Sequence, residues 1–284
     1  MTESRMVELF GQPICSQPEG GWGDVVKRQN CPFLDRKCIK TRKSQPRISI
    51  GTCTVEYGKD RNPIIICPFR FLERHQVFSD CIHLLTLHEP GNEFHVVPEI
   101  TVPGGSIDYV LVSARKRQVC DFVAIELQTL DTTGTVWPER QRFLASHGLK
   151  VRAGDRTSAS GFGMNWKMTA KTILVQLHHK IETFEHLGKH LVLVLQDELF
   201  EYMRREFSFD HVQRARLGDP MHVHSYRLMK MDASYQLELR DRWSTDANGI
   251  AACLGLQASA KIELAAIIEL LQSMLSRETL LRLA

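Results

Sequence analysis

The clearest pattern of apolar and polar positions lies in residues 94–128, where short β-branched runs alternate with turn residues. The first run leads into Pro103-Gly104-Gly105, and two more, at 107–112 and 119–128, flank the basic stretch 115–117. Apolar runs bounded by glycine, proline and charged residues are typical of strands joined by tight turns. This part of the chain therefore predicts three strands in a meander.

Other parts of the chain have apolar residues at helical spacing. The pattern predicts helices over residues 69–87, 166–187, 198–207 and from Ala260 onward. Shorter runs predict a buried strand at 191–195 and a strand pair at 223–231 and 235–239. Strands interleaved with helices indicate a mixed α/β fold, in which a mixed sheet is flanked by helices.

The first 70 residues differ from the rest, because glycines and prolines divide them into pieces too short to form a core of their own. Four cysteines are dispersed through this segment: Cys31, Cys38, Cys53 and Cys67. Four thiolates can hold a tetrahedral metal ion, and such a site would be structural because it leaves no open coordination position. The alternative is four buried structural thiols. We expect a small metal-stapled lobe over residues 1–70 and a larger domain over 71–284.

Composition limits the possible classes of protein. A hydrophobic share of 43% can build a full core, and 24% charged residues is ordinary for a globular chain. The net charge of +3 is compatible with a polyanionic partner without requiring one. No apolar run is long enough to span a membrane, and the N-terminus lacks the apolar core of a signal peptide. We therefore expect a cytoplasmic protein, in which the eight cysteines do not default to disulfides.

Acidic residues gather around the predicted meander. Glu99 precedes the turn, Asp108 begins the next strand, and Glu126 and Gln128 share one face at the end of the third strand. Carboxylates that converge in this way repel one another unless a cation is present, and oxygen ligands suit Mg²⁺. The plain alternative is that Asp108 is a turn residue and Glu126 lies on a solvated strand face.

Two motifs in the same order resemble the NotI restriction endonuclease family. One is Ile125-Glu126-Leu127-Gln128-Thr129-Leu130-Asp131 followed by Gly134, and the other is Cys31-Pro32-Phe33-Leu34 with Cys38, Cys53 and Cys67-Pro68. The resemblance covers roughly residues 30 to 180. It implies a nuclease core of the PD-(D/E)xK type, in which Gln128 stands where the wider superfamily has lysine.

The resemblance also implies roles for single residues. Asp108 and Glu126 would hold Mg²⁺, Glu99 would be an additional acidic residue, and Gln176 would match a family glutamine. Because an amide carries no charge, Gln128 would orient the attacking water by hydrogen bonds. The four cysteines would hold iron, while sulfur ligands by themselves suit zinc equally well.

The expected activity is that of a bacterial type II restriction endonuclease, which hydrolyses double-stranded DNA at a short GC-rich palindrome with Mg²⁺. A symmetric site is most simply cut by a homodimer. Dispersed arginines supply cations for phosphates and guanines, and His222 and His224 are expected to be surface or DNA-facing residues. Two alternatives remain: a non-catalytic metal-stapled DNA-binding protein, and a nonspecific repair nuclease with the same core.

Overall fold

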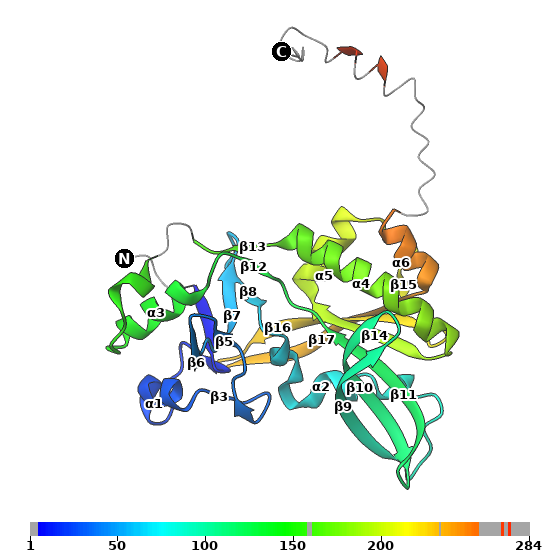
Figure 1. Ribbon diagram of the computed structural model, residues 1–284, viewed down its shortest axis with the longest axis horizontal. Helices are drawn as coiled ribbons and strands as arrows, with labels where there is room; N and C mark the ends of the chain where they lie inside the picture. Colours follow the sequence, from blue (N-terminus) through cyan, green and yellow to red (C-terminus); the bar gives the residue numbers. More distant parts are fainter. Residues whose placement is uncertain (1–4, 158–160, 233, 256–267, 270–271, 274–284) are drawn as a thin grey trace.

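The computed structural model describes residues 5–157, 161–232, 234–255, 268–269 and 272–273 (Figure 1). Within these residues the main feature is a mixed seven-stranded sheet in the order β15-β17-β16-β14-β11-β10-β9. Its strands are β9 (Glu93–Val102), β10 (Gly105–Arg115), β11 (Gln118–Leu127), β14 (His190–Gln196), β15 (Gln213–Arg214), β16 (Met221–Lys230) and β17 (Tyr235–Thr245). The β11-β14 and β14-β16 pairs are parallel, whereas the other neighbours are antiparallel.

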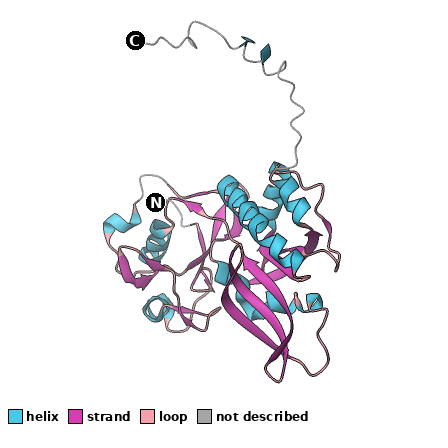
Figure 2. Cartoon of the chain, turned by 45° about the vertical axis from the view of Figure 1, so that its right-hand side comes forward, coloured by secondary structure: helices cyan, strands magenta, loops and turns pink. Residues whose placement is uncertain are grey.

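Helices cover both faces of this sheet. On one face lie α4 (Trp166–His186), α5 (Asp197–Glu206) and α6 (Ala247–Cys253), which Figure 2 shows gathered on one side of the strands. Ile173 and Leu177 of α4 pack there in one apolar core with Ala124 and Leu193 of the sheet. The other face is covered by the short segments η1 (Pro68–His75), α2 (Gln76–Ser79) and η2 (Ile82–Leu84).

The N-terminal segment forms a second, smaller sheet in the order β2-β1-β7-β8. Its strands are β1 (Met6–Leu9), β2 (Gln12–Pro13), β7 (Thr52–Tyr57) and β8 (Asn62–Ile65). Around it lie α1 (Gly21–Arg28), the strand pairs β3 (Asn30–Cys31) with β4 (Arg36–Lys37) and β5 (Thr41–Arg42) with β6 (Gln45–Ser49), and the later segments α3 (Trp137–Ser146), η3 (Ala153–Arg156), β12 (Thr132–Thr133) and β13 (Gly163–Met164). A third apolar cluster joins Trp22 of α1 to Phe143 of α3, so part of the later chain packs against this segment.

Most of the predicted elements are confirmed. The meander is present as β9, β10 and β11, and the helices and strands expected between residues 166 and 239 are present as α4, β14, α5, β16 and β17. The single helix expected over residues 69–87 is wrong. Arg74 and His75 have φ of 52° and 55°, which ends the helical turn and leaves three short segments instead. The terminal helix predicted from Ala260 lies, apart from residues 268–269 and 272–273, outside the described residues.

Candidate active site

The pairing of three neighbouring strands places the predicted acidic residues in one row. Tyr109 of β10 is opposite Ile125 of β11, so Asp108 and Glu126 are the next residues in the same register. On the other side, the pairs Ile107–Ile100 and Tyr109–Pro98 enclose the position at which Glu99 faces Asp108. Residues that lie opposite one another on neighbouring strands project to the same face. The row Glu99, Asp108 and Glu126 therefore faces the α4 side of the sheet.

Asp108 is held by the backbone of the neighbouring strand. The Leu127 N–H donates to Asp108 Oδ2 at 2.8 Å, and Oδ1 has no hydrogen-bond partner among the described residues. Burial raises the pKa of Asp108, while the Leu127 N–H and the nearby Lys180 act in the opposite direction. One carboxylate oxygen is thus fixed to the backbone and the other is available to a ligand.

Glu126 lies deeper, with only 5% of its surface exposed. Its Oε1 accepts a hydrogen bond from Lys180 Nζ at 2.6 Å, which forms a buried ion pair. Burial raises the pKa of Glu126 to about 7, although Lys180 lowers it, and the Asp108 charge raises it further. The site therefore combines two repelling carboxylates with one buried cation.

Lys180 is the residue that the sequence analysis missed. The buried residues of α4 include Ile173, Leu177, Lys180 and Phe184, which are spaced four, three and four positions apart. A lysine on the apolar stripe of an amphipathic helix is the signal that could have identified it, because an unpaired lysine is almost never fully buried. Gln176, which the resemblance matched to a family glutamine, lies one turn earlier on α4 and is exposed.

The turn between β9 and β10 fixes Lys180 in place. Lys180 Nζ donates a second hydrogen bond to the Ser106 carbonyl at 2.5 Å, and Thr183 Oγ1 donates to the Pro103 carbonyl at 3.3 Å. Gly104 has φ +91°, and a Cβ at this residue would lie 2.2 Å from the backbone oxygen of His179. The absence of a side chain therefore lets the turn lie directly on α4.

The remaining two predicted residues lie at the edge of this group. Glu99 is exposed and has φ 52°, which distorts β9 at the position opposite Asp108. Gln128 follows the last residue of β11 and is half-buried, and its N–H donates to the Val194 carbonyl at 2.9 Å. The backbone of Gln128 is thus anchored at the end of the parallel β11-β14 pair.

The four N-terminal cysteines are all buried and are reduced. The Cys67 thiol interacts electrostatically with Cys31 and Cys38, and it hydrogen-bonds to Cys53. This hydrogen bond from Cys53 is the largest cause that lowers the pKa of Cys67 to about 6. Backbone groups of Phe33, Leu34, Lys40, Gly51, Gly11, Phe69 and Arg70 also hydrogen-bond to the four sulfur atoms.

Across the described residues, no group of three or more His, Cys, Asp or Glu side chains has the arrangement of a formed metal site. For the carboxylate pair this is compatible with Mg²⁺, which binds through one or two carboxylates and keeps several waters. The donors at Asp108 and Glu126 are hard oxygens, so their chemistry fits this ion. The cysteine donors fit a soft ion such as iron or zinc, and their partner N–H groups would stabilise thiolates.

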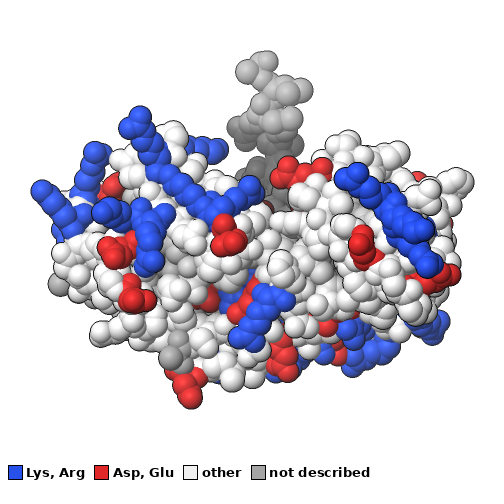
Figure 3. All heavy atoms as spheres, turned by 90° about the horizontal axis from the view of Figure 1, so that it is seen from below, with Lys and Arg blue, Asp and Glu red and all other residues white. Residues whose placement is uncertain are grey.

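Lysines and arginines form several separate groups on the face seen in Figure 3, with acidic residues between them. Along the described part of the chain, no helix is long and apolar enough to cross a membrane.

Comparison with known proteins identifies the family of this chain. The family model described as restriction endonuclease NotI matches residues 25–221, a range that includes the four cysteines, the acidic row and α4. No curated protein matches the chain. Because the matched range spans well over half of the 284 residues, the chain belongs to the NotI restriction endonuclease family.

Proposed function

We propose that this protein is a type II restriction endonuclease that hydrolyses double-stranded DNA at a short GC-rich palindrome in the presence of Mg²⁺. The observation that carries the proposal is the placement of Asp108 and Glu126 on adjacent strands, beside the buried Lys180, within the range matched by the family model. The strand order β9-β10-β11, followed by α4 and the parallel β14, supports a PD-(D/E)xK core.

Asp108 and Glu126 would hold the catalytic cation. When bound, Mg²⁺ lowers the pKa of a coordinated water and neutralises charge on the phosphodiester. Asp108 Oδ1 and Glu126 Oε2 are the oxygens without a hydrogen bond to the described residues, so they are the natural ligands. Glu99, exposed at the end of the row, could extend the acidic site toward solvent.

Lys180 and Gln128 would together take the role that one lysine of the motif has in the wider superfamily. Lys180 supplies the cation, because its ammonium group neutralises one of the two carboxylates and holds Glu126 Oε1 in place. Gln128 is uncharged and can orient water by donating and accepting hydrogen bonds. The position of Gln128 two residues after Glu126, with its backbone N–H bonded to the Val194 carbonyl, supports this role.

The four cysteines would hold a structural iron ion, with zinc as the alternative. Their burial, their mutual interactions and the surrounding N–H donors support a thiolate site. Such a site would stabilise the N-terminal lobe, because the free energy of metal binding is also free energy of folding. The ion would take no part in the reaction, since all four positions would be filled by sulfur.

The active form would be a homodimer, because a palindrome presents the same base edges to two symmetry-related protomers. Sedimentation of the protein with a duplex that contains one cleavage site tests this stoichiometry. Two chains per duplex are expected, and a stable 1:1 complex that cuts both strands would refute the dimer while leaving the nuclease assignment intact.

The direct experiment incubates the purified protein with plasmid DNA and Mg²⁺, and with EDTA as the control. Discrete bands that depend on Mg²⁺ are expected. A smear would indicate a nonspecific nuclease, and intact plasmid that is nevertheless retained by the protein would favour a non-catalytic DNA-binding protein. Glu126→Ala should abolish cleavage and leave DNA binding largely intact, because phosphate contacts are made elsewhere.

A further inference from the structure

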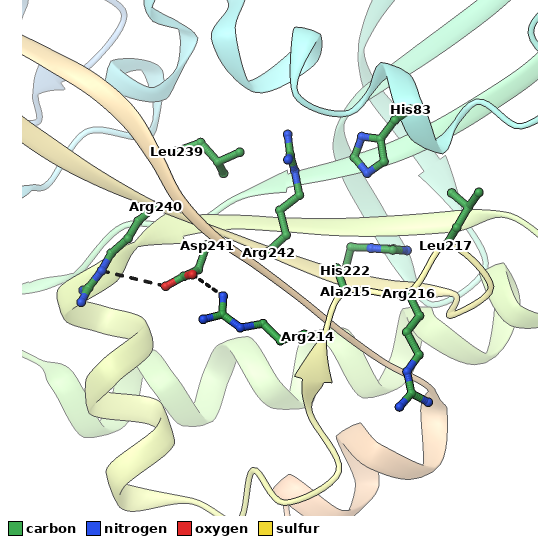
Figure 4. A pocket seen from close by; sticks show the side chains of 10 residues that line it. All are labelled: His83, Arg214, Ala215, Arg216, Leu217, His222, Leu239, Arg240, Asp241 and Arg242. Carbon is green, nitrogen blue, oxygen red and sulfur yellow. Dashed lines mark hydrogen bonds and ion pairs between the residues drawn. The ribbon is translucent and has the colours of Figure 1, made fainter.

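A basic pocket lies at the β15-β17 end of the large sheet, and it contains none of the residues of the acidic row. Its volume is about 690 Å³. Figure 4 shows that guanidinium groups from two different parts of the chain line it, together with two imidazoles. These residues are Arg214, Arg216, Arg240, Arg242, His83 and His222. Arg240 and Arg242 lie beyond the range matched by the family model.

The pocket is separated from the acidic row by the architecture of the sheet. Arg242 lies on β17, and β16 and β14 separate this strand from β11. At the usual spacing between strands, β17 and β11 are about 14 Å apart. His224, opposite Arg242, contacts Cys81 on the η2 side, whereas Lys180 contacts Glu126 on the α4 side. A ligand in this pocket therefore does not occupy the proposed catalytic site.

The cations of the pocket are only partly neutralised. Asp241 is the one carboxylate among the described residues that line it, and it pairs with Arg214. Arg240 pairs with Asp197 of α5 at 3.0 Å and lies 4.0 Å from Asp241. Arg216 hydrogen-bonds to the neutral amide of Gln213. Arg242 Nη2 is 3.4 Å from Asp80 Oδ1. The Nε atom of Arg242 is buried and has no acceptor among the described residues. A buried donor of this kind costs free energy until an acceptor reaches it.

Histidines lie in and beside the pocket, and two of them are buried, contrary to the prediction from the sequence. His222 and His224 are 1% and 0% exposed, so their interpretation as surface residues is wrong. His222 Nε2 hydrogen-bonds to the Asp219 carbonyl at 2.8 Å, while Nδ1 has no partner among the described residues. Burial lowers the pKa of His83 and His224, and the Arg242 charge lowers it further. The contribution of Arg242 to both shifts reflects its positive charge beside these two imidazoles.

We propose that this pocket binds a phosphate group. A phosphate presents several oxygens around one centre, so guanidinium groups from separate strands can each donate to it. It would accept hydrogen bonds from the Arg216 guanidinium group, which pairs with no carboxylate among the described residues. His222 lines the wall of the pocket beside these guanidinium groups.

The phosphate can come from a duplex or from a small molecule, and the experiment separates these sources. Arg216→Gln removes a pocket cation that pairs with no carboxylate in the described part of the chain, and Arg117→Gln, at the exposed β10-β11 turn, is the matched control. Calorimetric titration with sodium phosphate measures the small-molecule arm. Fluorescence anisotropy with a labelled duplex in EDTA, at several salt concentrations, measures the duplex arm without any need for cleavage.

Saturable phosphate binding that Arg216→Gln weakens by about 5-fold or more, while Arg117→Gln retains it, supports a small phosphorylated ligand. Duplex affinity that falls only in Arg216→Gln, with a salt slope smaller by about 1, supports a backbone phosphate. Equal behaviour of the two variants in both arms overturns the proposal. The proposed nuclease activity is measured separately with plasmid and Mg²⁺, so either conclusion can fail alone.

Discussion

Replacing Lys180 by methionine tests whether the buried cation is needed at the acidic row. The substitution removes the hydrogen bonds to Glu126 Oε1 at 2.6 Å and to the Ser106 carbonyl at 2.5 Å. Methionine is unbranched and apolar, so it can occupy the same space on α4 at small cost in packing. The principal effect should therefore fall on the carboxylate that loses its partner.

The magnitude follows from the pKa of about 7 at Glu126. An adjacent opposite charge lowers a carboxyl pKa by roughly 1 to 3, so the loss of Lys180 should raise the pKa of Glu126 to about 9. At pH 7.5 the ionised fraction would fall from about three quarters to about 3%, which is a loss of about 25-fold in protein able to bind a cation.

Plasmid cleavage between pH 6 and pH 9.5 measures this effect. In Lys180→Met, cleavage should be weak at neutral pH and should recover by about two pH units further into the alkaline range. Lys180→Arg keeps a cation and should retain part of the activity, and Lys171→Met, at an exposed position of the same helix, should behave as wild type. A Lys180→Met profile that coincides with that of the wild type would refute the reasoning.

Three further outcomes are expected. Because burial raises the folded-state pKa of Glu126 above its ordinary value of 4.5, its contribution to stability is complete below about pH 4.5 and is lost as the pH rises through about 7. Denaturant unfolding should therefore show the wild type losing more stability than Glu126→Gln between pH 5 and pH 8, and parallel curves would contradict this. Gly104→Ala should cost about 2 kcal/mol or more and impair cleavage, because it combines left-handed strain with a clash against α4. Gly58→Ala is the control, because Gly58 has φ +82° and no atom near its Cβ position, so this variant measures the backbone strain alone. Equal losses of stability in the two variants would show that the clash of residue 104 with α4 contributes nothing. Purified protein should carry one iron or zinc ion per chain, which Cys31→Ser or Cys67→Ser should release, and elemental analysis that finds no transition metal would disprove the cysteine site.

The amino-acid sequence alone determined the elements that make up the acidic row. Turn residues and β-branched runs are local signals, so the meander of β9, β10 and β11 and the long helix α4 could be predicted from them. Asp108 and Glu126 could be paired because side chains alternate along a strand with a period of two. The prediction of one helix over residues 69–87 was wrong because apolar spacing does not reveal the positive φ angles of Arg74 and His75.

Only the tertiary structure decided which groups meet. Lys180 and Glu126 are 54 residues apart, and their contact depends on how closely the turn at Gly104 packs against α4. The basic pocket likewise depends on the order β15-β17-β16, which brings Arg216 and Arg242 together from separate segments. Local periodicity fixes the direction of a side chain relative to its own strand or helix. Which charge lies opposite it depends on long-range packing, and that packing is set by the whole core and by no single stretch of the sequence.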